Sequence, residues 1–305
     1  MFTLGLDASR QLIEVLKDED PKEECIESVF SPQIRELPMG TVGTVVTESP
    51  LAHAIVSTGA KCIVTLSPTI FDSELASISV FLEKRFAFFR AYSFEGKRIV
   101  FKLPESKMGD CSAFLSDPNF PTGKALGENN LKSLIDIFNF LIIDATSSFM
   151  SKDAIGSPVS REHAEILLKD YGERTALILR LHDMFKTGRY PAYMILSGSS
   201  RFLETFLTLA GWKRNGISCG YRKVLEAIYR EGKLKTHAEK LMNESQKVRS
   251  LLAKNGWEVF DSDVPYFLAR GGKDIPPSAE IFEVKTFLGF PRDVKLFFPS
   301  DDPVL

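Results

Sequence analysis

The stretch SDPNFPTGKALGENNLKSLIDIFNFLIIDATSSF, residues 116–149, combines a turn, a helix and a strand. The turn lies at residues 118–123, because proline fixes the backbone angle φ and glycine frees it. Residues 128–138 carry apolar side chains at helical spacing. The apolar run 140–143 then ends in Asp144 and predicts a strand of a parallel sheet covered on both faces. An acid at the carboxyl end of such a strand lies where open α/β sheets bind ligands.

The composition is typical of a soluble protein that stays in the cytoplasm. The chain has 305 residues, 44% of them hydrophobic, which is enough for one large or two modest domains. Its 38 basic and 40 acidic residues give a formal charge of -2 without a basic stripe, so we expect no nucleic-acid partner. No apolar run approaches the ~18 residues of a membrane span, and the acidic N-terminus does not resemble a signal peptide. We therefore expect no membrane partner either.

The cysteines and histidines give no sign of a metal site. The four cysteines are scattered without C-x-x-C spacing, which predicts reduced thiols rather than a disulfide framework or a zinc site. The histidines lack metal-ligand spacing and are expected to have surface or core roles. These residues are Cys25, Cys62, Cys111 and Cys219, and His53, His163, His182 and His237.

Strand-like and helix-like segments alternate from Gly40 onward, which predicts an α/β fold with a mainly parallel, doubly wound sheet. Up to Asp144, the expected strands are 41–47, 62–66, 85–93, 97–103 and 140–143, and the expected helices are 51–57, 71–81 and 128–138. After Asp144, we expect helices at 160–169, 175–185, 224–255 and 279–288, and strands at 193–196, 257–262, 266–271 and 294–299. Residues 201–209 are apolar but ambiguous.

The change of pattern near Asn215 predicts a domain boundary. Residues 1–35 form an N-terminal arm with a short amphipathic helix, residues 36–214 a large α/β domain of cofactor-binding type, and residues 215–305 a smaller α+β domain.

Several motifs, in order, resemble the fold-type I pyridoxal-phosphate (PLP) enzymes, and especially aminotransferases like histidinol-phosphate aminotransferase. PNFPTGKAL followed by LIIDATSSF is similar to the family's N-P-x-N-P-T-G turn and its strand ending in D-E-x-Y. IVTLSPTIF, LAGWKRNGISCGY, WEVFDSDVPYFLAR and VKLFF resemble further family segments. The resemblance covers roughly residues 40–298. It implies a large PLP-type domain, a smaller domain and a homodimer with active sites at the interface.

At the family's cofactor-binding positions, the resemblance implies that one residue is the same in this sequence and that several are replaced. Asp144 falls on the aspartate that keeps the cofactor's pyridine nitrogen protonated. Phe120 replaces the asparagine that hydrogen-bonds the cofactor's phenolic oxygen, and Asn119 is one position away. Ile70 stands where an aromatic ring stacks on the cofactor, although a shift of register would bring Phe71 there. Ser147 replaces a tyrosine.

No lysine occupies the position of the Schiff-base lysine, which holds the cofactor and moves protons during catalysis. Three alternative registers place Ser200, Thr205 or Ala210 there. The nearest amines are Lys186 and Lys213, so Lys213 is a candidate catalytic residue.

The anion-binding positions are also changed. Lys213 in one register replaces the arginine that grips the cofactor phosphate, and Lys295 replaces the arginine that clamps the substrate carboxylate. In the phosphate-binding turn T-E-S-P only Ser49 remains useful. The SGSSR run offers an anion cradle through its serines, which are Ser197, Ser199 and Ser200.

Three hypotheses of function follow. The first is a degenerate aminotransferase-like protein that does not transaminate and still binds an amino acid or phosphorylated ligand near Asp144. The second is an active PLP enzyme acting on amino acids with a displaced lysine. The third is an unrelated α/β enzyme. The resemblance implies PLP as the cofactor, while the missing lysine argues against it.

Overall fold

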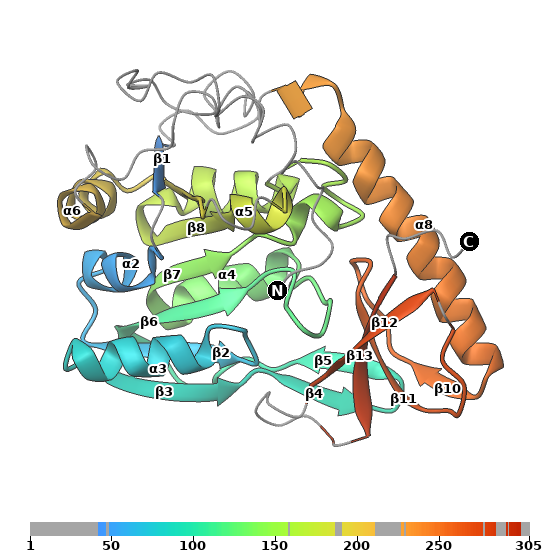
Figure 1. The fold of residues 1–305 in the computed structure, drawn as a ribbon. Helices are drawn as coiled ribbons and strands as arrows, with labels where there is room; N and C mark the ends of the chain where they lie inside the picture. Colours follow the sequence, from blue (N-terminus) through green and yellow to red (C-terminus); the bar gives the residue numbers. More distant parts are fainter. Residues whose placement is uncertain are drawn as a thin grey trace.

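The computed structural model describes residues 42–46, 49–157, 159–186, 191–210, 227–228, 230–276, 278–284, 291 and 293–299. Its larger sheet has seven strands in the order β1-β9-β8-β7-β6-β2-β3 (Figure 1). These strands are β1 (Val42–Val46), β2 (Cys62–Ser67), β3 (Arg85–Arg90), β6 (Met108–Ser116), β7 (Phe138–Asp144), β8 (Thr175–Arg180) and β9 (Tyr193–Ser197). The strands β3, β2, β6, β7 and β8, which are neighbours in this order in the sheet, pair in parallel. Strand β9 pairs antiparallel with both β8 and β1. The fold is therefore α/β with a mainly parallel central sheet, as predicted.

Helices cover both faces of this sheet. On one face, α2 (Leu51–Ser57), α3 (Asp72–Phe81) and α6 (Ser200–Ala210) pack on the side chains of Ile63, Phe114 and Ile142. The other face is covered by α4 (Glu128–Ile137) and by the π-helix η2 (His163–Asp170). Shorter helical turns are η1 (Ser148–Met150), η3 (Gly172–Arg174) and α5 (Leu181–Met184). Because side chains of the central strands face helices on both sides of the sheet, these strands are continuous runs of apolar residues.

A second, antiparallel sheet of four strands follows along the chain. Its order is β10-β11-β13-β12, and its strands are β10 (Trp257–Val259), β11 (Phe267–Gly271), β12 (Ala279–Glu283) and β13 (Val294–Pro299). The long helix α8 (Lys233–Lys254) runs beside this sheet, at the right of Figure 1. A hairpin of β4 (Tyr92–Glu95) and β5 (Arg98–Phe101) forms a separate two-stranded sheet, which packs on the hydrophobic cluster at the second face of the larger sheet. Side chains of the second sheet join the same hydrophobic cluster as the second face of the larger sheet.

Two predicted helices are wrong. Residues 175–180 form the strand β8 and only 181–184 are helical. All six residues of β8 are buried, so no alternation of polar and apolar residues marks it as a strand. Residues 279–283 form the strand β12, where pairing with β13 supplies the backbone partners that a helix would have supplied internally. The strand β6 was not predicted, and the ambiguous stretch after Ser200 is helix α6.

The prediction of reduced thiols is wrong for two cysteines. Cys62 and Cys111 form a disulfide between the adjacent strands β2 and β6. They are direct register partners, with Cα atoms 4.5 Å apart, although 49 positions separate them in the sequence. Only the strand pairing brings them within reach of each other. Cys25 and Cys219 lie outside the described residues.

The turn before α4 is locked against the second sheet. Gly123 adopts φ 73°, and its carbonyl oxygen accepts a hydrogen bond of 2.8 Å from Asp263 N. The carboxylate of Asp263 accepts a bond of 2.9 Å from Ala125 N and pairs with the ammonium of Lys124 at 3.0 Å. A Cβ atom on Gly123 would lie 2.1 Å from Ser262 Oγ. Glycine is therefore needed here for its backbone angle and for its lack of a side chain.

Replacing Gly123 with alanine tests this contact. The Cβ would also meet the carbonyl oxygen of Tyr266 at 2.8 Å, so the two segments must separate. Gly59→Ala is the matched control, because Gly59 has φ 67° and no atom within 4 Å of the added Cβ. We expect Gly123→Ala to lower the free energy of unfolding by about 2–4 kcal/mol more than Gly59→Ala, measured by urea denaturation. Equal losses would show that the contact is loose.

Candidate functional site

The carboxyl edge of the larger sheet gathers polar side chains on one face. Asp144 ends β7 and Arg180 ends β8. Side chains alternate along a strand, so Asp144 points to the same face as Ile142, and Arg180 to the same face as Ile178. Both isoleucines belong to the apolar cluster under α2, α3 and α6. The two charged side chains therefore emerge side by side above that cluster.

Arg180 and Asp144 form a buried ion pair. Arg180 Nη2 lies 3.4 Å from Asp144 Oδ2, and the two side chains are 7% and 3% exposed. The other terminal nitrogen of Arg180 donates to the carboxylate of Asp183. The guanidinium thus bridges two acids in a site with little water, where charges are stable only when they are paired.

The same guanidinium lies over the ring of Phe71. Its central carbon is 5.3 Å from the ring centroid, a cation–π distance. Phe71 is held by the turn before α3, in which the buried carboxylate of Asp72 accepts bonds of 2.7 Å from Thr65 and 3.1 Å from Thr69. Arg180 is therefore fixed between an acid on one side and an aromatic face on the other.

Thr146 sets the positions of the two charged partners. Its backbone N–H and its hydroxyl both donate to Asp144 Oδ1, and the hydroxyl accepts a bond of 2.9 Å from Arg180 N. One threonine thus orients the carboxylate and ties the end of β8 to the end of β7.

The side chains of the predicted turn are committed to structural contacts. Asn119 is fully buried, donates to Pro68 O at 2.9 Å and accepts from the hydroxyl of Thr122 at 2.8 Å. The ring of Phe120 packs on the rings of Tyr266 and Phe298, with centroids 5.3 and 6.2 Å apart. Asn119 joins the turn to the segment after β2, and Phe120 joins it to the second sheet.

Tyr266 brings a phenol to the site that the sequence did not reveal. Its hydroxyl lies 3.1 Å from Ser147 Oγ and 3.2 Å from Asn119 O. Burial raises the pKa of Tyr266, and the hydrogen bond to Ser147 offsets only part of this rise. The phenol is therefore neutral at physiological pH and acts as a hydrogen-bonding group. Its sequence context, an aromatic in the apolar strand YFLAR, gives no signal of this role.

The predicted anion-binding serines lie at two opposite edges of the sheet. Ser49 follows β1, whose last residue Val46 pairs with Tyr193 of β9. Tyr193 also pairs with Arg180 at the end of β8, so Ser49 is at the carboxyl edge. Its hydroxyl donates to the carboxylate of Glu74 at 2.8 Å. The other three serines lie at the amino edge, where Ser197 pairs with Ala176 and begins the connection to α6. These serines are Ser197, Ser199 and Ser200, and the structure does not bring them to Asp144.

The predicted lysines are also separated. Lys295 lies in β13 with its ammonium 6.0 Å from the ring centroid of Trp257, on the α8 side of the second sheet. Lys213 lies outside the described residues. Lys186 follows α5 in the connection from β8 to β9, which leaves the sheet at the same edge as Asp144. Within the described part of that connection it is the only lysine.

A buried Ser–His–Asp arrangement lies beneath the turn. His163 Nε2 is 2.8 Å from Asp117 Oδ2, and His163 Nδ1 is 3.3 Å from Ser148 Oγ. This is the order of groups in a serine nucleophile site. All three residues are at most 2% exposed, so no substrate reaches the hydroxyl. The group is a structural network, and it gives His163 the core role that the sequence predicted.

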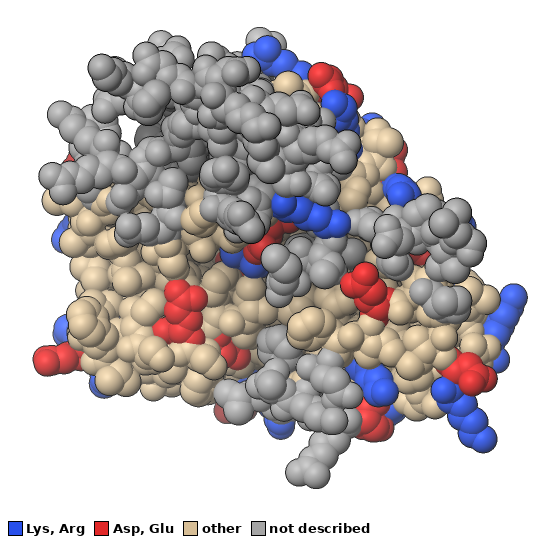
Figure 2. All heavy atoms as spheres, in the orientation of Figure 1, with Lys and Arg blue, Asp and Glu red and all other residues tan. Residues whose placement is uncertain are grey.

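On the face drawn in Figure 2, the described residues show no charged field of one sign. Figure 2 shows acidic and basic side chains scattered over the coloured part of one face. Among the described residues, no group of three histidine, cysteine or acidic side chains is placed to hold a metal ion. In the same part of the chain, no helix is long and apolar enough to cross a membrane.

Known proteins share this fold. No protein-family model matches the chain, and no curated protein matches it. A PLP-bound protein of Clostridium difficile, assigned as an aminotransferase, is similar with a TM-score of 0.74 at 13% identity, covering 98% of this chain and 87% of its own. An aminotransferase of Staphylococcus aureus gives 0.71 at 10%, covering 98% and 88%. The histidinol-phosphate aminotransferase of Clostridium acetobutylicum gives 0.66 at 13%, covering 99% and 92%.

The chain therefore has the fold of the fold-type I PLP-dependent aminotransferases. The resemblance stated from the motifs is confirmed at the level of fold.

The described residues at the carboxyl edge contact one another where the resemblance would place PLP. Under the shifted register that brings Phe71 to the stacking position, the ring of the cofactor would lie between Asp144 and Phe71, and Arg180 contacts both of these residues. Near the expected phosphate position the hydroxyl of Ser49 is bonded to an acid.

The Arg180–Asp144 pair can be tested by a double-mutant cycle. Arg180→Met leaves the buried carboxylate of Asp144 and the partly buried carboxylate of Asp183 without this cation, so we expect it to lower the free energy of unfolding by about 3–5 kcal/mol. The double variant Asp144→Asn/Arg180→Met also removes one of these acids. We expect its loss of unfolding free energy to be smaller than the sum of the losses of the two single variants, by at least ~1 kcal/mol. Urea denaturation measures all three variants. Additive losses would show that the pair is not coupled.

Proposed function

We propose that this chain is an aminotransferase-like protein that does not carry out ordinary transamination and uses its scaffold for binding. One observation carries the proposal: the guanidinium of Arg180 pairs with Asp144 and lies over Phe71. A cofactor ring would need the charge of the acid and the face of the aromatic at the same time. The side chain and the cofactor would therefore compete for one space.

The cost of displacing Arg180 supports this proposal. Moving the guanidinium away would leave Asp144 and Asp183 unpaired in a site where both are largely buried. Uncompensated buried charges cost several kcal/mol. A cofactor would have to offset this cost before it gained any contact of its own.

We propose further that a small ligand near Asp144 is an amino acid rather than a phosphorylated compound. Two carboxylates, Asp144 and Asp183, pair with the guanidinium of Arg180, and Glu74 accepts a hydrogen bond from the hydroxyl of Ser49. This charge distribution favours an ammonium group over a phosphate.

The test is the absorbance of the purified chain mixed with PLP. We expect no protein-bound band near ~420 nm and no pyridoxyl group fixed by borohydride. The second candidate function, an active PLP enzyme with a displaced lysine, predicts such a band, with the fixed group on Lys186 or Lys213. Lys186→Gln and Lys213→Gln are the matched variants, since each would abolish the band if its amine forms the Schiff base. A fixed group on either lysine would overturn the proposal.

The assembly is proposed from the resemblance. We propose a homodimer, because proteins with this motif pattern place their sites at a dimer interface. The cytoplasm is proposed from the composition, and the Cys62–Cys111 disulfide counts against it. Sedimentation velocity of the purified chain measures its mass directly. A single species with the mass of one chain over a wide concentration range would reject the dimer.

A further inference from the structure

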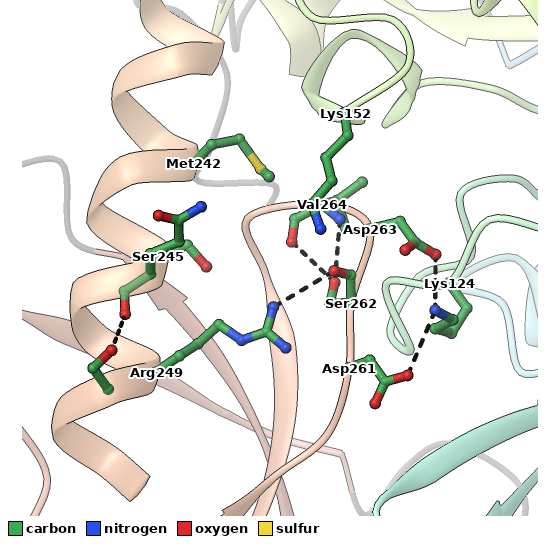
Figure 3. Close-up of a pocket in the computed structure, with 11 residues that line it drawn as sticks. Lys124, Lys152, Met242, Ser245, Arg249, Asp261, Ser262, Asp263 and Val264 are labelled. Carbon is green, nitrogen blue, oxygen red and sulfur yellow. Dashed lines mark hydrogen bonds and ion pairs between the residues drawn. The ribbon is translucent and has the colours of Figure 1, made fainter. Parts of the chain in front are cut away.

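A cavity lies between α8 and the turn that precedes α4, away from Asp144. Its volume is about 650 Å³, within the range of small-molecule sites. In Figure 3, Met242 and Arg249 enter it from α8, and Lys152 enters from the segment after η1. The loop that carries Ser262 forms its floor. Three separate parts of the chain thus converge on one space.

The charges that line the cavity do not cancel. Three cations line it, namely Lys124, Lys152 and Arg249, and two acids do so, namely Asp261 and Asp263. Both acids are already paired with Lys124, at 3.0 Å for Asp263 and 3.9 Å for Asp261. No carboxylate of the described residues lies within 4.0 Å of the ammonium of Lys152 or the guanidinium of Arg249. The described lining therefore carries one more cation than acids, although Asp261 and Asp263 also act on the charge of Arg249.

Arg249 is held in place with donors to spare. Its guanidinium donates to Phe260 O at 2.8 Å and Ser262 O at 3.5 Å, and it lies over the ring of Phe267 at 5.1 Å. A guanidinium has five N–H donors, so more remain than these two bonds use. Burial lowers the pKa of Arg249, which means that its charge is poorly solvated where it lies. An anion beside it would offset that loss of solvation.

We propose that this cavity binds a small molecule that carries a phosphate or carboxylate group, held between Lys152 and Arg249. The guanidinium keeps N–H donors beyond its two bonds to carbonyl oxygens, and the ammonium supplies a second positive charge. Met242 and Val264 give the rest of the ligand an apolar contact. The site does not involve Asp144 or Arg180, so it stands whether or not the chain transaminates.

The test is calorimetric titration of the full chain at constant ionic strength, with inorganic phosphate in one arm and succinate in the other. We expect saturable binding of at least one probe, and the arms distinguish the phosphate from the carboxylate ligand. Lys152→Gln and Arg249→Gln are each expected to weaken that binding by about tenfold, the loss of one charged contact. Lys247→Gln is the matched control, because Lys247 lies on α8 with its exposed ammonium 2.7 Å from Glu244.

Lys152 is exposed, so its variant keeps the test decisive even if Arg249→Gln does not fold. The proposal is overturned if neither probe saturates below ~10 mM, which is weaker than the affinity of a specific metabolite site. It is also overturned if Lys152→Gln binds as tightly as the unchanged chain, or if Lys247→Gln weakens binding as much as Lys152→Gln.

Discussion

The packing of the turn at Gly123 on the loop at Ser262 is the constraint that joins the two sheets. The loop N–H of Asp263 donates to the carbonyl oxygen of Gly123 at 2.8 Å, and the added Cβ of any other residue would strike Ser262. This contact lets Phe120 of the turn reach Tyr266 and Phe298 of the second sheet. The two sheets consequently share one hydrophobic cluster, and the proposed anion cavity opens beside the same junction.

At the carboxyl edge, the charge of Asp144 is compensated within the chain. Asp144 ends its strand where the motif resemblance places the cofactor aspartate, and Arg180 pairs with it. A buried ion pair contributes little net stability against apolar packing, yet it is costly to break once formed. The cation of Arg180 is therefore costly to displace from Asp144, which supports our proposal that the chain binds rather than transaminates.

The sequence predicted much of the fold and only part of the candidate site. The order of motifs gave the class of fold, and apolar periodicity located α2, α3, α4 and most strands. Apolar periodicity failed at β8, because a strand buried on both faces has no alternation of polar and apolar residues and therefore resembles a buried helix in composition. Reading that strand as a helix also hid Arg180, its last residue. The cross-strand partners Cys62 and Cys111 were missed because register depends on neighbours distant in sequence.

The sequence by itself determined the α/β class and the position of Asp144 at the end of a strand, because these depend on local order along the chain. The tertiary structure alone decided which groups meet. It placed Ser197 at the edge opposite Asp144, Lys295 beside Trp257, and Arg180 between Asp144 and Phe71. Those outcomes follow from strand direction and sheet order, which set the distance between side chains and which no local pattern encodes.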